Sequence, residues 1–100
     1  MPEPPSIHRT DEFDRWLRRL ADTRARAKVL VRVQRLAAGN PGDVAPIGDG
    51  LSELRIDYGP GYRVYFRSRG GAVVLLWGGD KSTQDADIRR AKGLAADLED

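Results

Sequence analysis

Residues 51–79 read LSELRIDYGPGYRVYFRSRGGAVVLLWGG. Apolar and polar side chains alternate in the first two segments of this stretch, which is the period of β-strands that bury one face. The residues predicted to face inward are Leu54, Ile56, Tyr58, Tyr62, Val64 and Phe66. Residues 72–77 are apolar at every position, as in a central strand covered on both faces. Glycine-rich turns at 59–61 and 68–71 separate the segments. The stretch therefore predicts an antiparallel meander of three strands.

Two helices are expected before the meander, joined as a helical hairpin. Thr10 or Asp11 can cap the first helix, Asp22-Thr23 offers a cap for the second, and Gly39 can end the second. Apolar residues follow the helical period in both. The predicted buried stripes are Phe13, Trp16, Leu17 and Leu20 in the first helix and Val29, Val33 and Leu36 in the second. A short strand is expected ahead of them at residues 6–10.

A last helix is expected after the meander, with Ser82 as its cap. Its predicted buried stripe is Ile88, Ala91, Ala95 and Leu98. The order strand, helix, helix, meander, helix predicts an α+β fold in which helices pack against the sheet. The 100 residues are expected to form one domain, with the proline-rich residues 1–5 disordered.

Arginine dominates the charge of the chain. Of its 17 basic residues 14 are arginine, and with 15 acidic residues the net charge is +2. Because the planar guanidinium matches phosphate, a polyanionic partner is expected, either nucleic acid or an acidic protein. The absence of cysteine excludes disulfides, thiol nucleophiles and zinc–cysteine sites. No apolar run could span a membrane and no secretion signal is visible, so a cytoplasmic location is expected.

Basic side chains gather on the polar face of the predicted meander. Arg63, Tyr65 and Arg67 alternate along one strand, and Arg55 lies on the neighbouring strand, about 5 Å away. Lys81 follows the last strand. Like charges held together favour an anion between them, so the cluster predicts a phosphate site. The alternative is that these arginines pair with strand and loop carboxylates as ordinary surface charges, those of Glu53, Asp57 and Asp80.

The available side chains limit the chemistry that such a site could perform. His8 is the only histidine, so a catalytic pair of histidines is excluded. RNA supplies its own nucleophile, the 2′-hydroxyl, and needs from the protein orientation, charge stabilisation and proton transfer. Arginine and lysine can stabilise the charge, and Tyr65 or Lys81 could move protons. Because DNA lacks the 2′-hydroxyl, this chemistry predicts a nuclease restricted to RNA.

Other residues are candidates for contacts with RNA or with a partner. Trp77, at the end of a buried strand, could stack on a base. The second helix carries a basic stripe, which is either a solvated face or a contact with the ribosome or another partner: Arg24, Lys28, Arg32 and Arg35. No metal site is expected, because Asp85 and Asp87 at a helix start are explained by the helix dipole.

Three segments carry a resemblance to a known family, LSELRI at 51–56, GPGYRVYF at 59–66 and GGDKSTQ at 78–84. In this order and spacing they resemble the RelE/ParE superfamily of bacterial type II toxins, and within it the HigB-like addiction module killer proteins. The resemblance runs from Thr10 to Leu98. It implies the RelE-like fold, with an N-terminal strand, a helical hairpin, a three-stranded antiparallel meander and a C-terminal helix.

The resemblance also implies an activity, that of a ribosome-dependent mRNA endoribonuclease. Such a toxin acts without metal or other cofactor, through attack of the 2′-hydroxyl on the adjacent phosphate. By position, Arg63 matches an arginine that holds the scissile phosphate, and Arg55 and Lys81 match other basic positions of the site. Tyr65 is a further catalytic candidate, whereas Glu53 stands where a lysine is common. The RNA-binding candidates are Arg67, Trp77, Arg32 and Arg35.

The partners implied by the resemblance are mRNA, the 70S ribosome and a cognate antitoxin. The antitoxin would be a helix-turn-helix DNA-binding protein, and the toxin would reach operator DNA only in complex with it. ParE relatives share the fold but inhibit DNA gyrase. The alternatives are therefore a toxin that inhibits gyrase or another protein, or a module that binds its antitoxin without activity.

Overall fold

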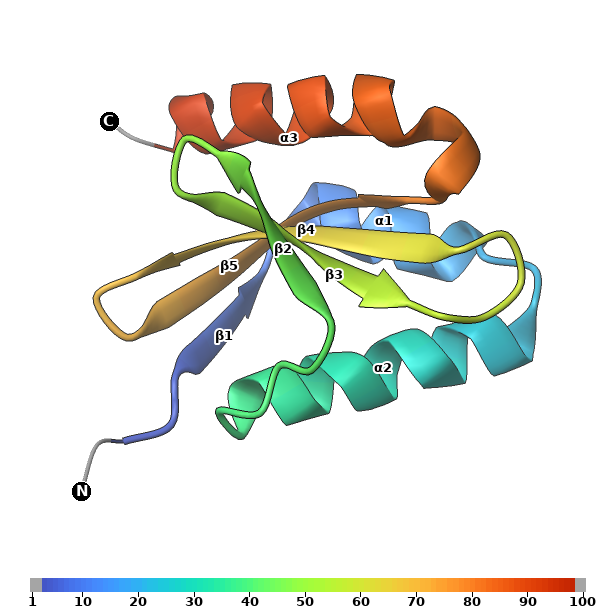
Figure 1. Ribbon diagram of the computed structural model, residues 1–100, viewed down its shortest axis with the longest axis horizontal. Coiled ribbons are helices and arrows are strands. Elements are labelled where there is room, and N and C mark those ends of the chain that lie inside the picture. Colours follow the sequence, from blue (N-terminus) through green and yellow to red (C-terminus); the bar gives the residue numbers. More distant parts are fainter. Residues whose placement is uncertain (1–2, 99–100) are drawn as a thin grey trace.

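The computed structural model describes residues 3–98, which form a mixed α+β fold with a five-stranded sheet and three α-helices (Figure 1). The elements are β1 (Ser6–Arg9), α1 (Asp11–Arg19), α2 (Thr23–Ala37), β2 (Val44–Gly48), β3 (Leu51–Ile56), β4 (Tyr62–Arg69), β5 (Ala72–Gly79), a short 3-10 helix η1 (Lys81–Thr83) and α3 (Gln84–Asp97). The sheet order is β1-β5-β4-β3-β2. β1 runs parallel to β5, and all other neighbours are antiparallel. None of the helices within residues 3–98 is long and apolar enough to cross a membrane.

The predicted meander is confirmed as β3, β4 and β5, and the predicted first strand is confirmed as β1. The sheet has one strand more than expected, because β2 pairs with β3 along the outer edge. Its sequence VAPIG does not signal a strand, since Pro46 cannot donate a ladder hydrogen bond. An edge strand tolerates proline, and the register shifts between Pro46 and Gly48.

The first two helices begin and end where the sequence predicts. The Thr10 hydroxyl accepts a hydrogen bond from the Phe13 amide at 3.1 Å, and the Asp22 carboxylate accepts one from the Arg24 amide at 2.9 Å. Gly39 follows α2 with a φ of +82°, a conformation that favours glycine. These caps satisfy amide groups that a helix start otherwise leaves unpaired.

The start of the last helix differs from the prediction. Ser82 does not cap α3, because η1 lies between β5 and α3. The Asp80 carboxylate caps this short helix by accepting a hydrogen bond from the Ser82 amide at 2.8 Å. Thr83 is the N-cap of α3, and its side chain makes no capping bond. Lys81 is therefore the first residue of η1 and lies three residues before the start of α3.

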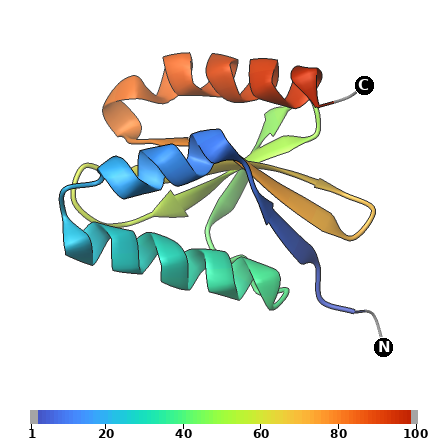
Figure 2. The same ribbon diagram turned by 180° about the vertical axis from the view of Figure 1, so that it is seen from behind.

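α3 lies on one face of the sheet and α1 with α2 on the other (Figures 1 and 2). An apolar cluster lies on each side of the sheet. The larger cluster lies between the sheet and α1 with α2, and its members include Phe13, Leu17, Val29, Val33, Leu54, Val64 and Leu75. Trp16 packs against this cluster, as predicted. The smaller cluster lies under α3 and consists of Leu51, Tyr65, Leu76, Ala91 and Ala95. Leu98, predicted to be buried with them, is 47% exposed.

Two adjacent glycines at the end of β5 let both helical layers approach the sheet. A Cβ on Gly78 would lie 2.2 Å from the indole ring of Trp16 in α1. A Cβ on Gly79 would lie 1.8 Å from a carboxylate oxygen of Asp87 in α3. Since real Cβ atoms do not tolerate such contacts, this close packing requires glycine at both positions.

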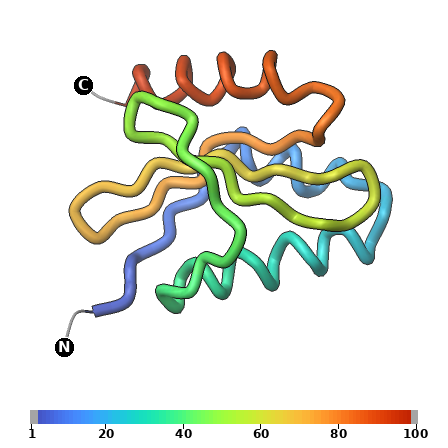
Figure 3. The backbone as a smooth tube through the Cα atoms, viewed as in Figure 1, coloured from blue at the N-terminus to red at the C-terminus, as the bar shows by residue number. Residues whose placement is uncertain are grey.

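The expectation of an open polar face on the meander is wrong for most of its length. α3 covers that face, and Glu53 and Tyr65, expected on a solvated surface, are 1% and 0% exposed. The end of the sheet beside the β3–β4 turn stays open, with Arg55 and Arg63 lining a hollow there. Figure 3 shows this turn at the same end of the molecule as the start of α3.

Candidate functional site

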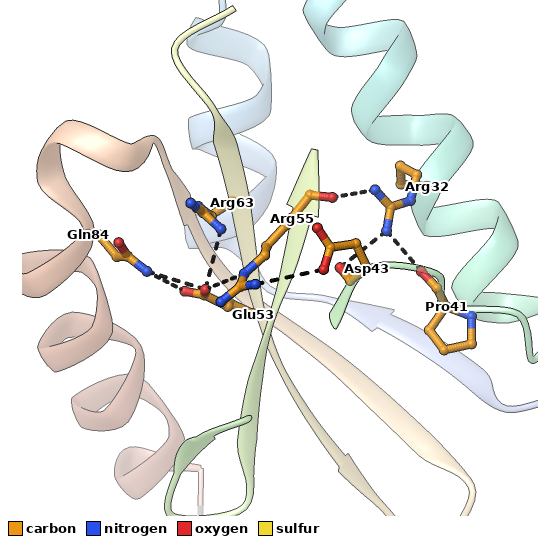
Figure 4. Close-up of polar contacts among 7 residues, drawn as sticks. All are labelled: Arg32, Pro41, Asp43, Glu53, Arg55, Arg63 and Gln84. Atoms are coloured by element: carbon orange, nitrogen blue, oxygen red, sulfur yellow. Dashed lines mark hydrogen bonds and ion pairs between the residues drawn. The ribbon is translucent and has the colours of Figure 1, made fainter. Parts of the chain in front are cut away.

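The carboxylate of Glu53 is the centre of a polar cluster that joins β3, β4 and α3 (Figure 4). It accepts hydrogen bonds from Arg55 Nε at 2.9 Å and from Arg63 Nη1 at 3.4 Å. Gln84, the first residue of α3, donates to it from the other side at 2.9 Å. The strand register explains the arrangement, because Arg55 lies directly opposite Arg63 and all three strand residues face the same side.

An open hollow of about 590 Å³ lies next to this cluster. Its lining residues are Asp43, Arg55, Ile56, Asp57, Gly59, Pro60, Gly61, Arg63 and Lys81. The side chain of Arg63 is 13% exposed and that of Arg55 is 42% exposed, so Arg63 lies deep in the hollow and Arg55 at its rim. Lys81 comes from η1 and packs close to the β3–β4 turn, because a Cβ on Gly61 would be 3.4 Å from the Lys81 Cβ. Three of the predicted catalytic residues are therefore brought together.

The charges of the hollow are more balanced than the sequence suggests. Its lining carries three positive and two negative side chains, and Glu53 adds a third negative charge behind them. Asp43 Oδ1 lies 3.8 Å from Arg55 Nη1 at the rim. The hydrogen bond to Glu53 raises the pKa of Arg55, which keeps that guanidinium charged. Two guanidiniums share the single charge of Glu53, and Asp43 supplies a second negative charge at the rim, so the formal charges in and behind the hollow sum to zero.

Tyr65 does not reach this hollow. It is 0% exposed in the cluster under α3, and its hydroxyl has no hydrogen-bond partner among the described residues. Burial raises the pKa of Tyr65, and the nearby carboxylates of Asp87 and Glu53 raise it further. A phenol held neutral inside the core is poorly placed to exchange a proton with a substrate in the hollow.

The predicted RNA-binding residues lie at three different places. Arg67 donates to the carbonyl of Ala95 at 3.5 Å and lines another hollow, beside α3. The Trp77 indole donates to Asp87 at 2.9 Å and lies under the guanidinium of Arg90, 4.9 Å from the ring centre. Both side chains are thus engaged with α3 rather than grouped around the Arg63 hollow.

The two arginines of α2 differ in their surroundings. Arg32 donates to the carbonyls of Arg55, Pro41 and Asp43, the last two at 2.9 and 3.3 Å, and so ties the loop before β2 to β3 (Figure 4). Arg35 is exposed and lines a hollow of about 590 Å³ along α2. The α2 hollow and the Arg63 hollow share Ile56 and Asp57 in their linings, so they adjoin.

The aspartates near the start of α3 have structural partners. Asp80 binds Ser82, and Asp87 accepts hydrogen bonds from Trp77 and Thr83. Within residues 3–98 no three carboxylate or histidine side chains lie close enough to hold a metal ion.

Sequence reasoning did not assign Glu53 and Gln84 to the site. The sequence offered Glu53 only as a surface partner for the arginines. The structure bears out that pairing for Arg55 and Arg63 but buries the carboxylate. Gln84 has no signal, because its contact depends on how α3 packs across the sheet.

Comparison with known proteins places the chain in a family. Residues 15–96 match the family described as Phage derived protein Gp49-like (DUF891), a span that includes Arg55, Arg63 and Lys81. An uncharacterized protein of Haemophilus influenzae is 54% identical over 93 residues, which cover 92% of this chain and 94% of that relative. The chain therefore belongs to the phage-derived Gp49-like family, a toxin-like family of the RelE/Gp49 superfamily.

Proposed function

We propose that this protein is the toxin of a type II toxin–antitoxin module, a HigB-like mRNA endoribonuclease with a RelE-like fold that cuts RNA on the ribosome. The observation that carries the proposal is the convergence of Arg55, Arg63 and Lys81, from two strands and η1, on one open hollow. Membership of a toxin-like family supports the biological role.

The hollow suits the cleavage of RNA by its own 2′-hydroxyl. The 2′-oxygen attacks the adjacent phosphorus as the proton of the 2′-hydroxyl passes to solvent water. The bond from phosphorus to the 5′-oxygen breaks as that oxygen takes up a proton, and a 2′,3′-cyclic phosphate and a 5′-hydroxyl result. Negative charge grows on the non-bridging oxygens in the transition state, where guanidinium donors are most effective. Arg63, deep in the hollow, is assigned to these oxygens together with Arg55. Lys81, at the exposed rim, is assigned to the leaving 5′-oxygen, to which it can donate a proton.

A strand of RNA held at Arg63 has a basic surface on which to continue. The α2 hollow adjoins the Arg63 hollow, and its basic lining residues are Arg24, Lys28, Arg32 and Arg35. Arg32 already donates to carbonyls of the protein backbone. We therefore assign the contacts with RNA phosphates mainly to Arg24, Lys28 and Arg35. The same basic surface suits an antitoxin, which would silence the toxin by covering it with acidic side chains.

The proposal is tested with purified protein, 70S ribosomes and a programmed mRNA, with cleavage mapped by primer extension. Arg63→Ala is expected to lower the rate of cleavage by about 10²–10³-fold, the cost of removing one donor to a transition-state oxyanion. Lys81→Ala changes an exposed side chain and is expected to lower the rate without affecting the fold. Arg18→Ala, an exposed arginine of α1 outside the hollow, is the matched control and should keep the wild-type rate.

Two results would contradict the proposal. One is wild-type cleavage by a folded Arg63→Ala variant, which would show that the hollow is not the catalytic site. The other is toxicity in cells with intact transcripts and a DNA-damage response, which would favour inhibition of gyrase instead.

A further inference from the structure

A buried carboxylate at the back of a phosphate site requires an explanation. Glu53 is 1% exposed, and its negative charge opposes the binding of an anion in the adjacent hollow. Burial of a charge is also costly unless hydrogen bonds compensate for it. Three donors do so here, from Arg55, Arg63 and Gln84. An apolar residue would fill the same space without weakening the attraction for RNA.

We propose that Glu53 is a positioning residue, which holds the guanidiniums of Arg55 and Arg63 in the orientation that the transition state needs. The inference rests on the proposed function and deepens it. Each guanidinium has five N–H groups in a rigid plane. Glu53 accepts one hydrogen bond from Nε of Arg55 at 2.9 Å and one from Nη1 of Arg63 at 3.4 Å, so it ties both guanidiniums to one fixed point. The Nε of Arg63 is buried without a partner among the described residues. Without Glu53, two long side chains of like charge would move apart.

The Gln84 contact extends this role to the third cation. Gln84 begins α3, directly after η1, which carries Lys81. Its hydrogen bonds to Glu53, at 2.9 and 3.2 Å, fix the start of α3 against β3. Glu53 therefore connects the strands that carry the two arginines with the segment that carries the lysine.

This role predicts effects of opposite sign on binding and on turnover. Glu53→Gln removes a negative charge behind the hollow, so RNA should bind as tightly as in the wild type or more tightly. The same change loosens the guanidiniums, and a misplacement of about 1 Å can lower turnover by about 10²-fold. We expect kcat to fall by about 10–100-fold while the Kd for RNA stays equal or decreases.

The experiment measures kcat together with the Kd for an uncleavable RNA that carries a 2′-deoxy nucleotide at the cleaved position. Asp49→Asn is the matched control, because it removes one negative charge from an exposed residue outside the hollow. It should leave both values unchanged. The proposal is overturned if folded Glu53→Gln keeps the wild-type kcat, or if its affinity for the uncleavable RNA falls along with kcat.

A second variant keeps the test decisive if Glu53→Gln does not fold. Gln84→Ala leaves the carboxylate and its charge in place but removes one of its three donors. It should lower kcat by about 10-fold with no change in affinity for the uncleavable RNA. An unchanged kcat in this variant contradicts a positioning role.

A separate measurement distinguishes failure of this inference from failure of the proposed function. If the wild-type protein cleaves no RNA, the proposed function fails, but the orientation of the arginines can still be observed. Inorganic phosphate should shift the ¹⁵N–¹H signals of Arg55 Nε and Arg63 Nε in the wild type and in Asp49→Asn. In Glu53→Gln those signals should be broadened and insensitive to phosphate, and equal responses in all three proteins would overturn the inference.

Discussion

Replacing Tyr65 by phenylalanine tests how its side chain packs between the sheet and α3. The Tyr65 ring is 0% exposed and its hydroxyl has no hydrogen-bond partner among the described residues. An unpaired buried polar group costs about 1–3 kcal/mol, whereas the phenylalanine ring keeps the same packing with Leu76 and Ala91. Tyr65→Phe should therefore stabilise the protein by about 1 kcal/mol. For a domain of this size, that corresponds to a rise in Tm of about 4–8 °C.

The assay is urea unfolding at neutral pH, followed by the cleavage reaction on the same samples. A loss of about 1 kcal/mol would refute the reasoning, because it would mean that the hydroxyl has a partner, such as a buried water. Tyr65→Phe should cleave RNA at the wild-type rate. A large loss of cleavage in the fully folded variant would show that the Tyr65 hydroxyl takes part in catalysis.

The pH dependence of stability gives an independent check on Tyr65. Burial raises the pKa of Tyr65 above its ordinary value of 10.0. A raised pKa in the folded state contributes stability that is present below pH 10 and is lost as the pH rises toward the folded-state pKa. The wild type should therefore lose more stability than Tyr65→Phe above pH 10. Parallel stability curves for the two proteins in this range would contradict the burial of the phenol.

Four further substitutions test the packing of the fold. Gly78→Ala places a methyl group 2.2 Å from the indole in α1 and should destabilise the protein by about 1–3 kcal/mol in urea unfolding. Gly93 lies in α3, where an added Cβ meets nothing within 4 Å, so Gly93→Ala should stabilise the protein by about 0.5–1 kcal/mol. Arg32→Ala removes donors to three backbone carbonyls and should cost about 1–3 kcal/mol, which hydrogen exchange would locate in residues 41–43. The hydrogen bond from Tyr58 and those from the helix amides lower the pKa of Asp22. The ionised carboxylate therefore stabilises the fold above pH 3.8, and this stability is lost as the pH falls further. In acid unfolding, Asp22→Asn should lack this loss of stability.

Much of the local structure could be predicted because short-range contacts decide it. The hydroxyl of Thr10 and the carboxylate of Asp22 bind amides within three residues of themselves, so the starts of α1 and α2 follow from nearby sequence. The alternation in β3 and β4 likewise shows that Arg55 and Arg63 share one face. Three of the four expected catalytic residues consequently line a common hollow.

The sequence did not predict the surroundings of residues that a distant segment covers. Alternation shows which side chains lie on the same side of a strand but not what covers that side. α3 covers it here, so Tyr65 became part of a core and Arg67 and Trp77 became contacts of α3. The edge strand β2 was missed for the same reason, since pairing with β3 rather than its own residues stabilises it.

The sequence by itself determined the caps of the first two helices, the turns of the meander, the meander itself and the gathering of basic side chains on one strand face. Only the tertiary structure decided that Glu53 lies buried between Arg55 and Arg63, and that the hollow beside them is open next to the β3–β4 turn. The physical reason is that caps and alternation depend on atoms a few residues apart. The burial of a charge depends on which helix packs across the sheet, and that is set by the free energy of the whole core.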